Sequence, residues 1–111
     1  MTVKEIAHLL GFKIYCGSAG LENEIKGGYT SDLLSDVVGH AKEGDIWITL
    51  HTHKNITAVA SLKKLSAIVL VKGCSPDEDT AEASEVEGIP ILGTSMQCFE
   101  ISGAIYEQLK V

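Results

Sequence analysis

This sequence has few cysteines and few aromatic residues. The first scarcity argues against a fold held by disulfides or a zinc site, and the second against an aromatic core. The three cysteines, Cys16, Cys74 and Cys98, are odd in number, lie far apart and form no CxxC pair. A disulfide framework or a cysteine-based zinc site is therefore not expected, and a reducing cytosol is the natural setting. Aromatic residues make up 5% of the chain, so the core should consist of aliphatic side chains.

Positive charge is also in short supply. The chain has 9 lysine and arginine residues against 15 aspartate and glutamate residues, for a formal net charge of −6. A nucleic-acid surface needs clustered basic residues, so no nucleic-acid partner is expected. The sequence has neither the run of about 18 apolar residues that a membrane span needs nor a signal-peptide pattern. We expect a cytoplasmic protein without membrane contact.

The motifs that usually carry catalysis and phosphate binding are missing as well. No GxxxxGK[ST] loop occurs, no GxGxxG follows a predicted strand, and no GxSxG elbow is present. The sequence therefore predicts no catalytic residue and no cofactor. Any nucleotide would have to be held by polar turns alone.

What the sequence does contain is a repeated strand, polar turn and helix. With 111 residues, of which 45% are hydrophobic, residues 1–111 should form one folded domain. The repeat occurs at residues 46–65, 67–87 and 90–109, and a capped helix and a short strand precede it. Such alternation is typical of βαβ units. We predict a single α/β domain with a mostly parallel sheet, of three or four parallel core strands, covered by helices.

Polar residues stand where three of the predicted helices begin. Ser31 or Asp32 is expected to be the N-cap of a helix over residues 33–41. Ser75 is expected to cap the next-to-last helix, with Pro76 at its first position. Thr94 has the spacing of a capping box for the last helix.

Apolar residues at helical spacing predict the buried faces of these helices. The stripes include Leu33 and Val38 in the helix over residues 33–41, and Leu62 in the helix that follows the first repeat strand. The helix near residues 76–87 has Val86 as its only large apolar residue, so it should be an outer, solvent-facing helix.

The predicted strands lead into polar residues that could bind a ligand. In an open parallel sheet, ligands bind beyond the carboxyl ends of the strands. Each polar group precedes a helix N-terminus, where free backbone N–H groups favour an anion. The candidate ligand-binding residues are Ser31, Asp32, His51, Thr52, His53, Asn55, Gly73, Thr94 and Ser95. The alternative is that these residues only cap their own helices.

The stretch ITLHTHKN, residues 48–55, contains a histidine pair that suggests a second alternative. His51 and His53 would share one face of a strand and could serve a small enzyme as general base, or hold a metal. A catalytic zinc needs three protein ligands, and no third candidate stands at a diagnostic spacing. No metal is therefore predicted.

Two long runs of the sequence resemble the DRTGG domain. They are IKGGYTSDLLSDVVGHAKEGDIWITLHTHKNITAVASLKKLSAIVLVKG and GIPILGTSMQCFEISGAIYE. The most specific pieces are SDLLSDV, GDIWIT and HTHKNITAVA, and the resemblance extends from Val3 to about Leu109. The literal Asp-Arg-Thr-Gly-Gly string is absent, so the resemblance rests on pattern and order.

The resemblance implies a regulatory module. DRTGG domains are similar to the N-terminal domain of HPr kinase/phosphorylase and to the UDP-binding domain of Mur ligases. They accompany CBS pairs in regulated pyrophosphatases, where they serve regulation and dimer contact, and the kinase half with its phosphate loop is missing here. The resemblance thus implies a homodimer without catalytic activity, with a nucleotide or a regulatory protein as partner.

Three functions follow from the sequence. The first is a non-catalytic regulatory module that binds a nucleotide or another small anion at the carboxyl ends of its strands. The second is the small enzyme or metal-binding protein that uses His51 or His53. The third is a pure interaction protein whose polar turns serve only as caps.

Overall fold

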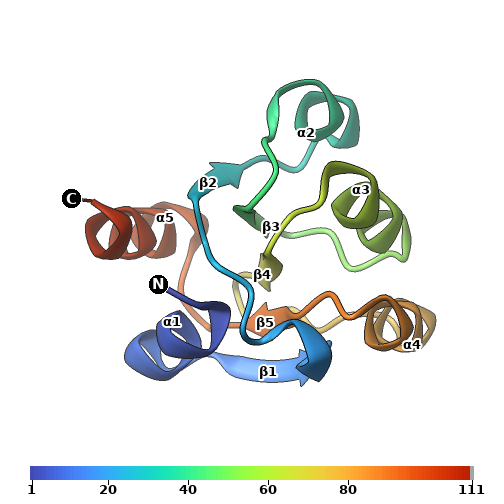
Figure 1. Ribbon diagram of the computed structural model, residues 1–111, viewed down its shortest axis with the longest axis horizontal. Coiled ribbons are helices and arrows are strands. Elements are labelled where there is room, and N and C mark those ends of the chain that lie inside the picture. Colours follow the sequence, from blue (N-terminus) through green and yellow to red (C-terminus); the bar gives the residue numbers. More distant parts are fainter. Residues whose placement is uncertain (111) are drawn as a thin grey trace.

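The computed structural model describes residues 1–110, in which five α-helices surround a five-stranded sheet (Figure 1). The helices are α1 (Val3–Leu10), α2 (Leu34–His40), α3 (Asn55–Lys63), α4 (Glu78–Glu87) and α5 (Cys98–Leu109). The strands are β1 (Lys13–Cys16), β2 (Gly27–Thr30), β3 (Asp45–Thr49), β4 (Ala67–Leu70) and β5 (Ile91–Gly93), and a 3₁₀ turn, η1 (Ser18–Gly20), follows β1. The predicted α/β fold is confirmed. Among the described residues, no helix has both the length and the apolar character that a membrane crossing requires.

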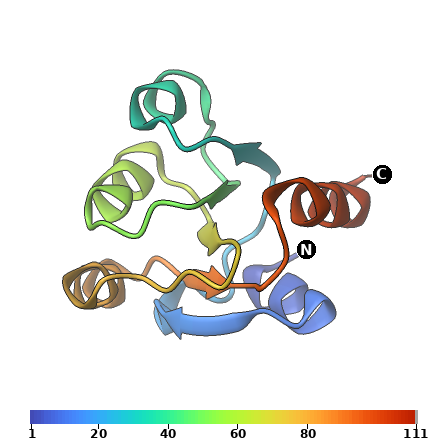
Figure 2. The same ribbon diagram turned by 180° about the vertical axis from the view of Figure 1, so that it is seen from behind.

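The sheet has the strand order β1-β5-β4-β3-β2. Strands β2 to β5 are parallel to one another, and β1 pairs antiparallel with β5 at one edge. The predicted mostly parallel sheet is confirmed. Strand β2 forms the other edge, which Figure 2 shows from behind. In the β2–β3 pair, Gly27 lies opposite Asp45, and a Cβ atom at Gly27 would lie 2.9 Å from the Asp45 carboxylate.

The two central strands bury both of their faces. Every residue of β3 and β4 is buried, as expected for parallel strands that helices cover on both sides. Helices α1 and α5 pack on one face, where their side chains meet Ile46 and Ile48 of β3. Helices α2 and α3 pack on the other face around Trp47, which is fully buried, and α4 lies beside α3 (Figure 1). The indole N–H of Trp47 donates to the Ser31 carbonyl at 2.8 Å, so this large side chain leaves no polar atom unpaired.

Helix α1 begins and ends as its sequence predicts. The Thr2 hydroxyl accepts a hydrogen bond from the Glu5 N–H at 3.2 Å, and the Glu5 carboxylate accepts one from the Thr2 N–H at 2.9 Å. The helix stops at Gly11, which has a φ of 69°. Glycine adopts this left-handed conformation without a steric penalty.

The predicted N-caps of three other helices are wrong. Helix α2 has Leu33 at its N-cap without a side-chain cap, because Asp32 bonds to the end of β3 instead. Helix α4 begins at Glu78 rather than Pro76, because the Asp77 N–H donates to the Thr52 carbonyl at 3.1 Å and keeps this segment beside the β3–α3 loop.

Helix α5 also begins later than predicted. Its N-cap is Gln97 rather than Thr94. The Thr94 N–H donates to the Leu70 carbonyl at 3.0 Å, so Thr94 still continues the β4–β5 ladder and is not free to start a helix.

Three residues that the apolar stripes placed in the core are exposed. Leu33 is 64% exposed, Val38 37% and Leu62 68%. The reason is that α2 and α3 bury only a narrow stripe each, such as Val37 in α2.

Helix α4 is more deeply buried than expected of an outer helix with one large apolar residue. Val86 is exposed, but Thr80 and Ser84 are fully buried. The Ser84 hydroxyl shares a 2.6 Å hydrogen bond with Thr57 of α3, and the Thr80 hydroxyl donates to the Thr52 carbonyl at 2.7 Å. One hydroxyl pair between α3 and α4, and one hydroxyl bond to the loop before α3, therefore hold α4 in place, which the sequence pattern did not indicate.

We predict opposite effects of two glycine-to-alanine substitutions on stability. Gly17 has a φ of 81°, and a Cβ there would collide with the Ile89 backbone, so Gly17→Ala should lower the free energy of unfolding by more than about 1 kcal/mol. Gly39 lies in α2 with no atom within 4 Å of an added Cβ, so Gly39→Ala should raise that free energy by roughly 0.5–1 kcal/mol. Urea denaturation measures both, and equal effects of the two substitutions would contradict the described backbone.

Candidate functional site

The four parallel strands end at one edge of the sheet, and their following loops form what we call the strand-end edge. Across the sheet this edge runs from the end of β5, past β4 and β3, to the end of β2. All nine predicted site residues lie in these loops except Asn55, which is the first residue of α3. The structure thus places them along one edge, but it brings only some of them together.

Asp32 ties the end of β2 to the end of β3. One oxygen of its carboxylate, Oδ1, accepts hydrogen bonds from the Thr49 hydroxyl and from the Leu50 N–H, both at 2.8 Å. A ring nitrogen of His51 contacts the Asp32 carbonyl. Ser31 serves locally, since its hydroxyl accepts from the Leu33 N–H at 3.2 Å. This part of the edge satisfies its own polar groups.

The two histidines do not share a strand face, so that expectation is wrong. Strand β3 ends at Thr49, and both imidazoles lie in the turn that follows. His53 Nδ1 accepts from the Asn55 N–H at 3.2 Å, whereas His51 turns toward Asp32. Within residues 1–110 no three histidine, cysteine or acidic side chains are grouped closely enough to hold a metal ion.

The Thr52 carbonyl connects the edge to α4. It accepts from the Asp77 N–H and from the Thr80 hydroxyl. The Thr52 side chain itself is half-buried beside the two histidines. This loop is held by its backbone, which leaves the Thr52 side chain free of the bonds to α4.

A hollow opens where β4 and β5 end. The Gly73 N–H donates to the Thr94 carbonyl at 2.9 Å, and the Lys72 N–H donates to the Met96 carbonyl at 2.9 Å. These bonds hold two loops side by side along a hollow of about 440 Å³. Its lining residues are Leu10, Gly11, Lys13, Tyr15, Gly73, Gly93, Thr94, Ser95 and Met96. Three predicted site residues, Gly73, Thr94 and Ser95, therefore meet here.

Two residues that the sequence reasoning missed complete this hollow. The Lys13 ammonium lies 4.8 Å from the centre of the Tyr15 ring, an arrangement that favours a cation over an aromatic face. Gly93 is required beneath them, because a Cβ atom there would collide with the Tyr15 ring. Lys13 and Tyr15 both come from β1. No sequence signal indicated that β1 pairs antiparallel with β5.

Two of the cysteines, Cys16 and Cys98, are poorly suited to nucleophilic chemistry. Burial raises the pKa of the Cys98 thiol, and the nearby Asp32 carboxylate adds to this effect. Burial also raises the pKa of Cys16, which lies in the core. A reactive cysteine needs the opposite shift toward the thiolate.

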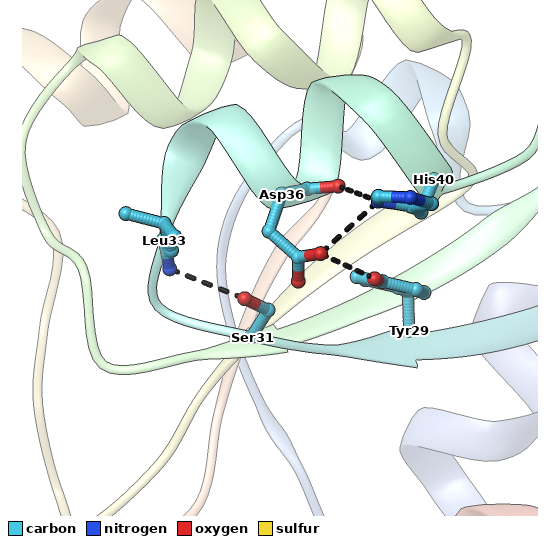
Figure 3. A network of polar contacts seen from close by, with 5 residues as sticks. All are labelled: Tyr29, Ser31, Leu33, Asp36 and His40. Carbon is cyan, nitrogen blue, oxygen red and sulfur yellow. Dashed lines mark hydrogen bonds and ion pairs between the residues drawn. The ribbon is translucent and has the colours of Figure 1, made fainter.

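A polar network lies beside Ser31, between β2 and α2 (Figure 3). The Tyr29 hydroxyl donates to Asp36 Oδ1 at 2.9 Å, and His40 Nδ1 lies 3.1 Å from the same oxygen. Hydrogen bonds from the hydroxyls of Ser31 and Tyr29, assisted by His40, lower the pKa of the Asp36 carboxyl. Partial burial and the bond to Asp36 raise the pKa of Tyr29.

A larger hollow lies elsewhere, between the edge strand β2 and helix α5. This β2–α5 groove has a volume of about 840 Å³. It is lined by Lys26, Gly27, Gly28, Thr30, Ile48, Phe99, Glu100, Ser102, Gly103, Ile105, Tyr106, Leu109 and Lys110. Phe99 is 87% exposed and Tyr106 69%. The sequence carried a signal for it, since Phe99, Gly103 and Tyr106 form a second stripe at helical spacing beside the buried stripe of α5.

A comparison with protein-family models finds no family that matches, and a comparison with curated proteins finds no match either. Among solved structures, the chain is similar to the crystal structure of the CBS and DRTGG domains of the regulatory region of Clostridium perfringens pyrophosphatase, complexed with its activator, diadenosine tetraphosphate. The TM-score is 0.69 at 17% sequence identity. The alignment covers 94% of this chain and 45% of that chain.

This likeness concerns the fold. The predicted resemblance to a DRTGG domain is confirmed at that level, because nearly the whole chain aligns with a region that contains one. The chain spans less than half the length of that regulatory region, which also contains CBS domains.

We predict that the hydrogen bonds accepted by the Asp32 carboxylate stabilise the fold. Asp32→Ala removes the acceptor of the buried Thr49 hydroxyl and of the Leu50 N–H, and should lower the free energy of unfolding by about 1–3 kcal/mol. Asp32→Asn keeps an acceptor oxygen and should recover a large part of this loss. Chemical denaturation of the three proteins tests this, and an Asp32→Ala protein as stable as the wild type would contradict it.

We predict that Asp36 makes stability depend on acid pH. Its folded pKa is lowered below the ordinary value of about 3.9, so its contribution is fully present above about pH 4 and is lost as the pH falls through the folded value. The wild type should therefore lose more thermal stability than Asp36→Asn between about pH 6 and pH 3. Glu82→Gln, at an exposed carboxylate of α4, is the control and should lose as much stability as the wild type. Parallel losses in all three proteins would refute the role of Asp36.

Proposed function

We propose that this protein is a non-catalytic regulatory module that binds a small anionic ligand, first of all a nucleotide, at the strand-end edge. The observation that carries the proposal is the hollow at the ends of β4 and β5. It is concave, it collects three of the predicted site residues, and it adds a lysine and a tyrosine from β1.

The composition of this hollow suits a nucleotide better than the rest of the edge does. Lys13 supplies positive charge, and Ser95 and Thr94 offer polar groups where a helix follows. Tyr15 and Met96 supply flat or flexible apolar surface for a base. Near β2 and β3, by contrast, the Asp32 carboxylate would repel an anion.

The fold supports the regulatory part of the proposal. The structure that this chain resembles is a regulatory region complexed with diadenosine tetraphosphate, a nucleotide activator. The chain also lacks the phosphate-loop motifs of kinases and ATPases. A regulatory module with a nucleotide ligand accounts for both observations without a catalytic site.

The wider setting is proposed on the same basis. We propose one domain over residues 1–111, a homodimer, and a cytoplasmic location in keeping with three cysteines that form no disulfide. A regulatory protein partner is the remaining expectation from the sequence.

Titration calorimetry with a panel of adenine and uridine nucleotides, diadenosine tetraphosphate and inorganic phosphate tests the ligand. At least one nucleotide should bind, and Lys13→Ala should weaken it by about tenfold, equivalent to 1.4 kcal/mol, through lost charge pairing. Lys4→Ala is the matched control, since Lys4 is an exposed lysine of α1 outside the hollow, and it should leave binding unchanged.

Two outcomes would count against the proposal. No heat and no thermal shift with any member of the panel would remove the ligand and leave protein contact as the function. Binding that Lys13→Ala and Lys4→Ala weaken equally would place the ligand outside the hollow.

A further inference from the structure

The two edges of the sheet are built differently. At the β1 edge, Lys13 and a register shift between Ile14 and Cys16 interrupt the strand. Lysines and bulges of this kind protect an edge from pairing with another chain. At the other edge, β2 has an unbroken register with β3 and contains neither lysine nor proline. Within residues 1–110, only the β2 edge is therefore open to a further strand.

The backbone of β2 has hydrogen-bonding groups directed away from the sheet. The Ser31 N–H donates to the Ile48 carbonyl, and parallel strands bond through alternate residues. The N–H and C=O groups of Gly28 and Thr30 consequently point away from β3. Both residues are exposed, so a strand laid alongside would meet no side-chain barrier at Gly28.

Apolar surface flanks this open edge. The β2–α5 groove runs along it, and Phe99 and Tyr106 rise from its α5 side with most of their surface exposed. Helix α5 is tied to β2 through a 2.9 Å hydrogen bond between the hydroxyls of Thr30 and Ser102. The strand edge and the aromatic side chains thus line one groove, and the two elements that carry it, β2 and α5, lie side by side in Figure 1.

Charge makes this surface suitable for a second copy of an acidic chain. Helix α4 carries the acidic residues Glu78, Asp79, Glu82, Glu85 and Glu87, and it packs beside α3 and β1, away from β2. The groove instead carries Lys26, Lys110 and Glu100. Two copies that meet here keep their acidic helices far apart, whereas contact through the β1 edge would bring them together.

The charges of the groove are also arranged for a two-fold axis. Lys26 precedes β2 and Lys110 follows α5, so both lie at one end of the groove, while Glu100 lies in the first turn of α5 toward the other end. Lys110 has a partner in its own chain, because its ammonium lies 3.6 Å from Glu107. The stem of Lys26 lies against Gly44, and Lys26 lines the groove from there. A two-fold axis across β2 would bring Lys26 of one copy to Glu100 of the other.

We propose that two copies of this chain associate through β2. The two β2 strands pair antiparallel about a two-fold axis, and Phe99 and Tyr106 of each copy cover the β2 strand of the other. Gly28 of one copy then bonds to Thr30 of the other, and the sheet continues from copy to copy. Such an interface is isologous and closed, which limits assembly to a dimer. This inference names the contact surface of the homodimer in the proposed function and does not depend on the nucleotide.

Light scattering coupled to size exclusion, over a dilution series of the full chain, tests the interface. The wild type should be a dimer, and both Gly28→Lys and Phe99→Glu should raise its dissociation constant at least about tenfold. An added Cβ at Gly28 has Ile46 Cγ2 as its nearest atom at 3.5 Å, so Gly28→Lys should still fold. Val86→Glu is the matched control, because Val86 is as exposed as Phe99, at 87%, but lies on α4.

A charge exchange gives a second, independent test. Lys26→Glu and Glu100→Lys should each weaken the dimer, whereas the double variant should regain affinity because the pair is restored with reversed sign. The melting temperature of each variant shows that it folds. A gain of affinity in the double variant requires Lys26 and Glu100 to face each other across the interface.

The results separate this inference from the proposed function. A wild-type monomer that still binds a nucleotide would overturn the interface and leave the ligand proposal standing. A dimer that resists Gly28→Lys and Phe99→Glu would overturn this interface and place the contact on another surface. A dimer sensitive to both, but not to Val86→Glu, confirms it even where no nucleotide binds.

Discussion

The burial of β3 and β4 on both faces is the constraint on which the rest of this structure depends. Every side chain of these two strands is removed from water, so each face of the sheet needs a layer of helices. The parallel connections place α2, α3 and α4 in one layer, and the chain ends supply α1 and α5 to the other (Figure 1). On the face covered by α1 and α5, α5 is the helix that contacts β2. The β2 edge beside α5 therefore stays partly uncovered.

The same constraint decides where polar groups gather. Strands that run in one direction bring all their loops to one edge, and the helices that follow bring their amino ends to the same place. In the loops after β2 and β3 these groups bond to one another, as Asp32 does with Thr49 and Leu50. After β4 and β5 the loops are held by backbone bonds and by the Thr94 hydroxyl, which accepts from the Met96 N–H, and a hollow remains between them and β1.

Helix α5 and the loop before it connect the two proposed surfaces. Its first turn lies near Asp32 at the strand-end edge, and the Ser102 hydroxyl joins it to Thr30 of β2. Its exposed stripe lines the groove beside the open strand. The proposed ligand surface therefore lies beside β1 and β5, and the proposed dimer surface lies beside β2 on the opposite side of the sheet. Helix α5 is adjacent to the dimer surface, and the loop before α5 is adjacent to the ligand surface.

Several local features could be predicted from the sequence because they depend on neighbouring residues. The capping box of Thr2 and Glu5, the helix stop at Gly11 and the buried strand at Ala67–Leu70 are of this kind. The predicted caps at Ser75 and Thr94 failed because distant partners, the carbonyls of Thr52 and Leu70, bind the backbone of these segments first. A local capping preference does not decide where a helix begins when a long-range hydrogen bond already binds the backbone of the same segment.

The sequence by itself determined the α/β class, the order of the elements and the edge of the sheet at which polar residues collect, since periodicity and chain direction fix all three. Only the tertiary structure decided that His51 faces Asp32 while His53 bonds within its own loop. It also decided that Tyr15 and Lys13 join Gly73 and Thr94, and that β2 is left open beside Phe99 and Tyr106. Each of these depends on which distant segments become neighbours, and burial of the central strands sets that through the packing of whole helices.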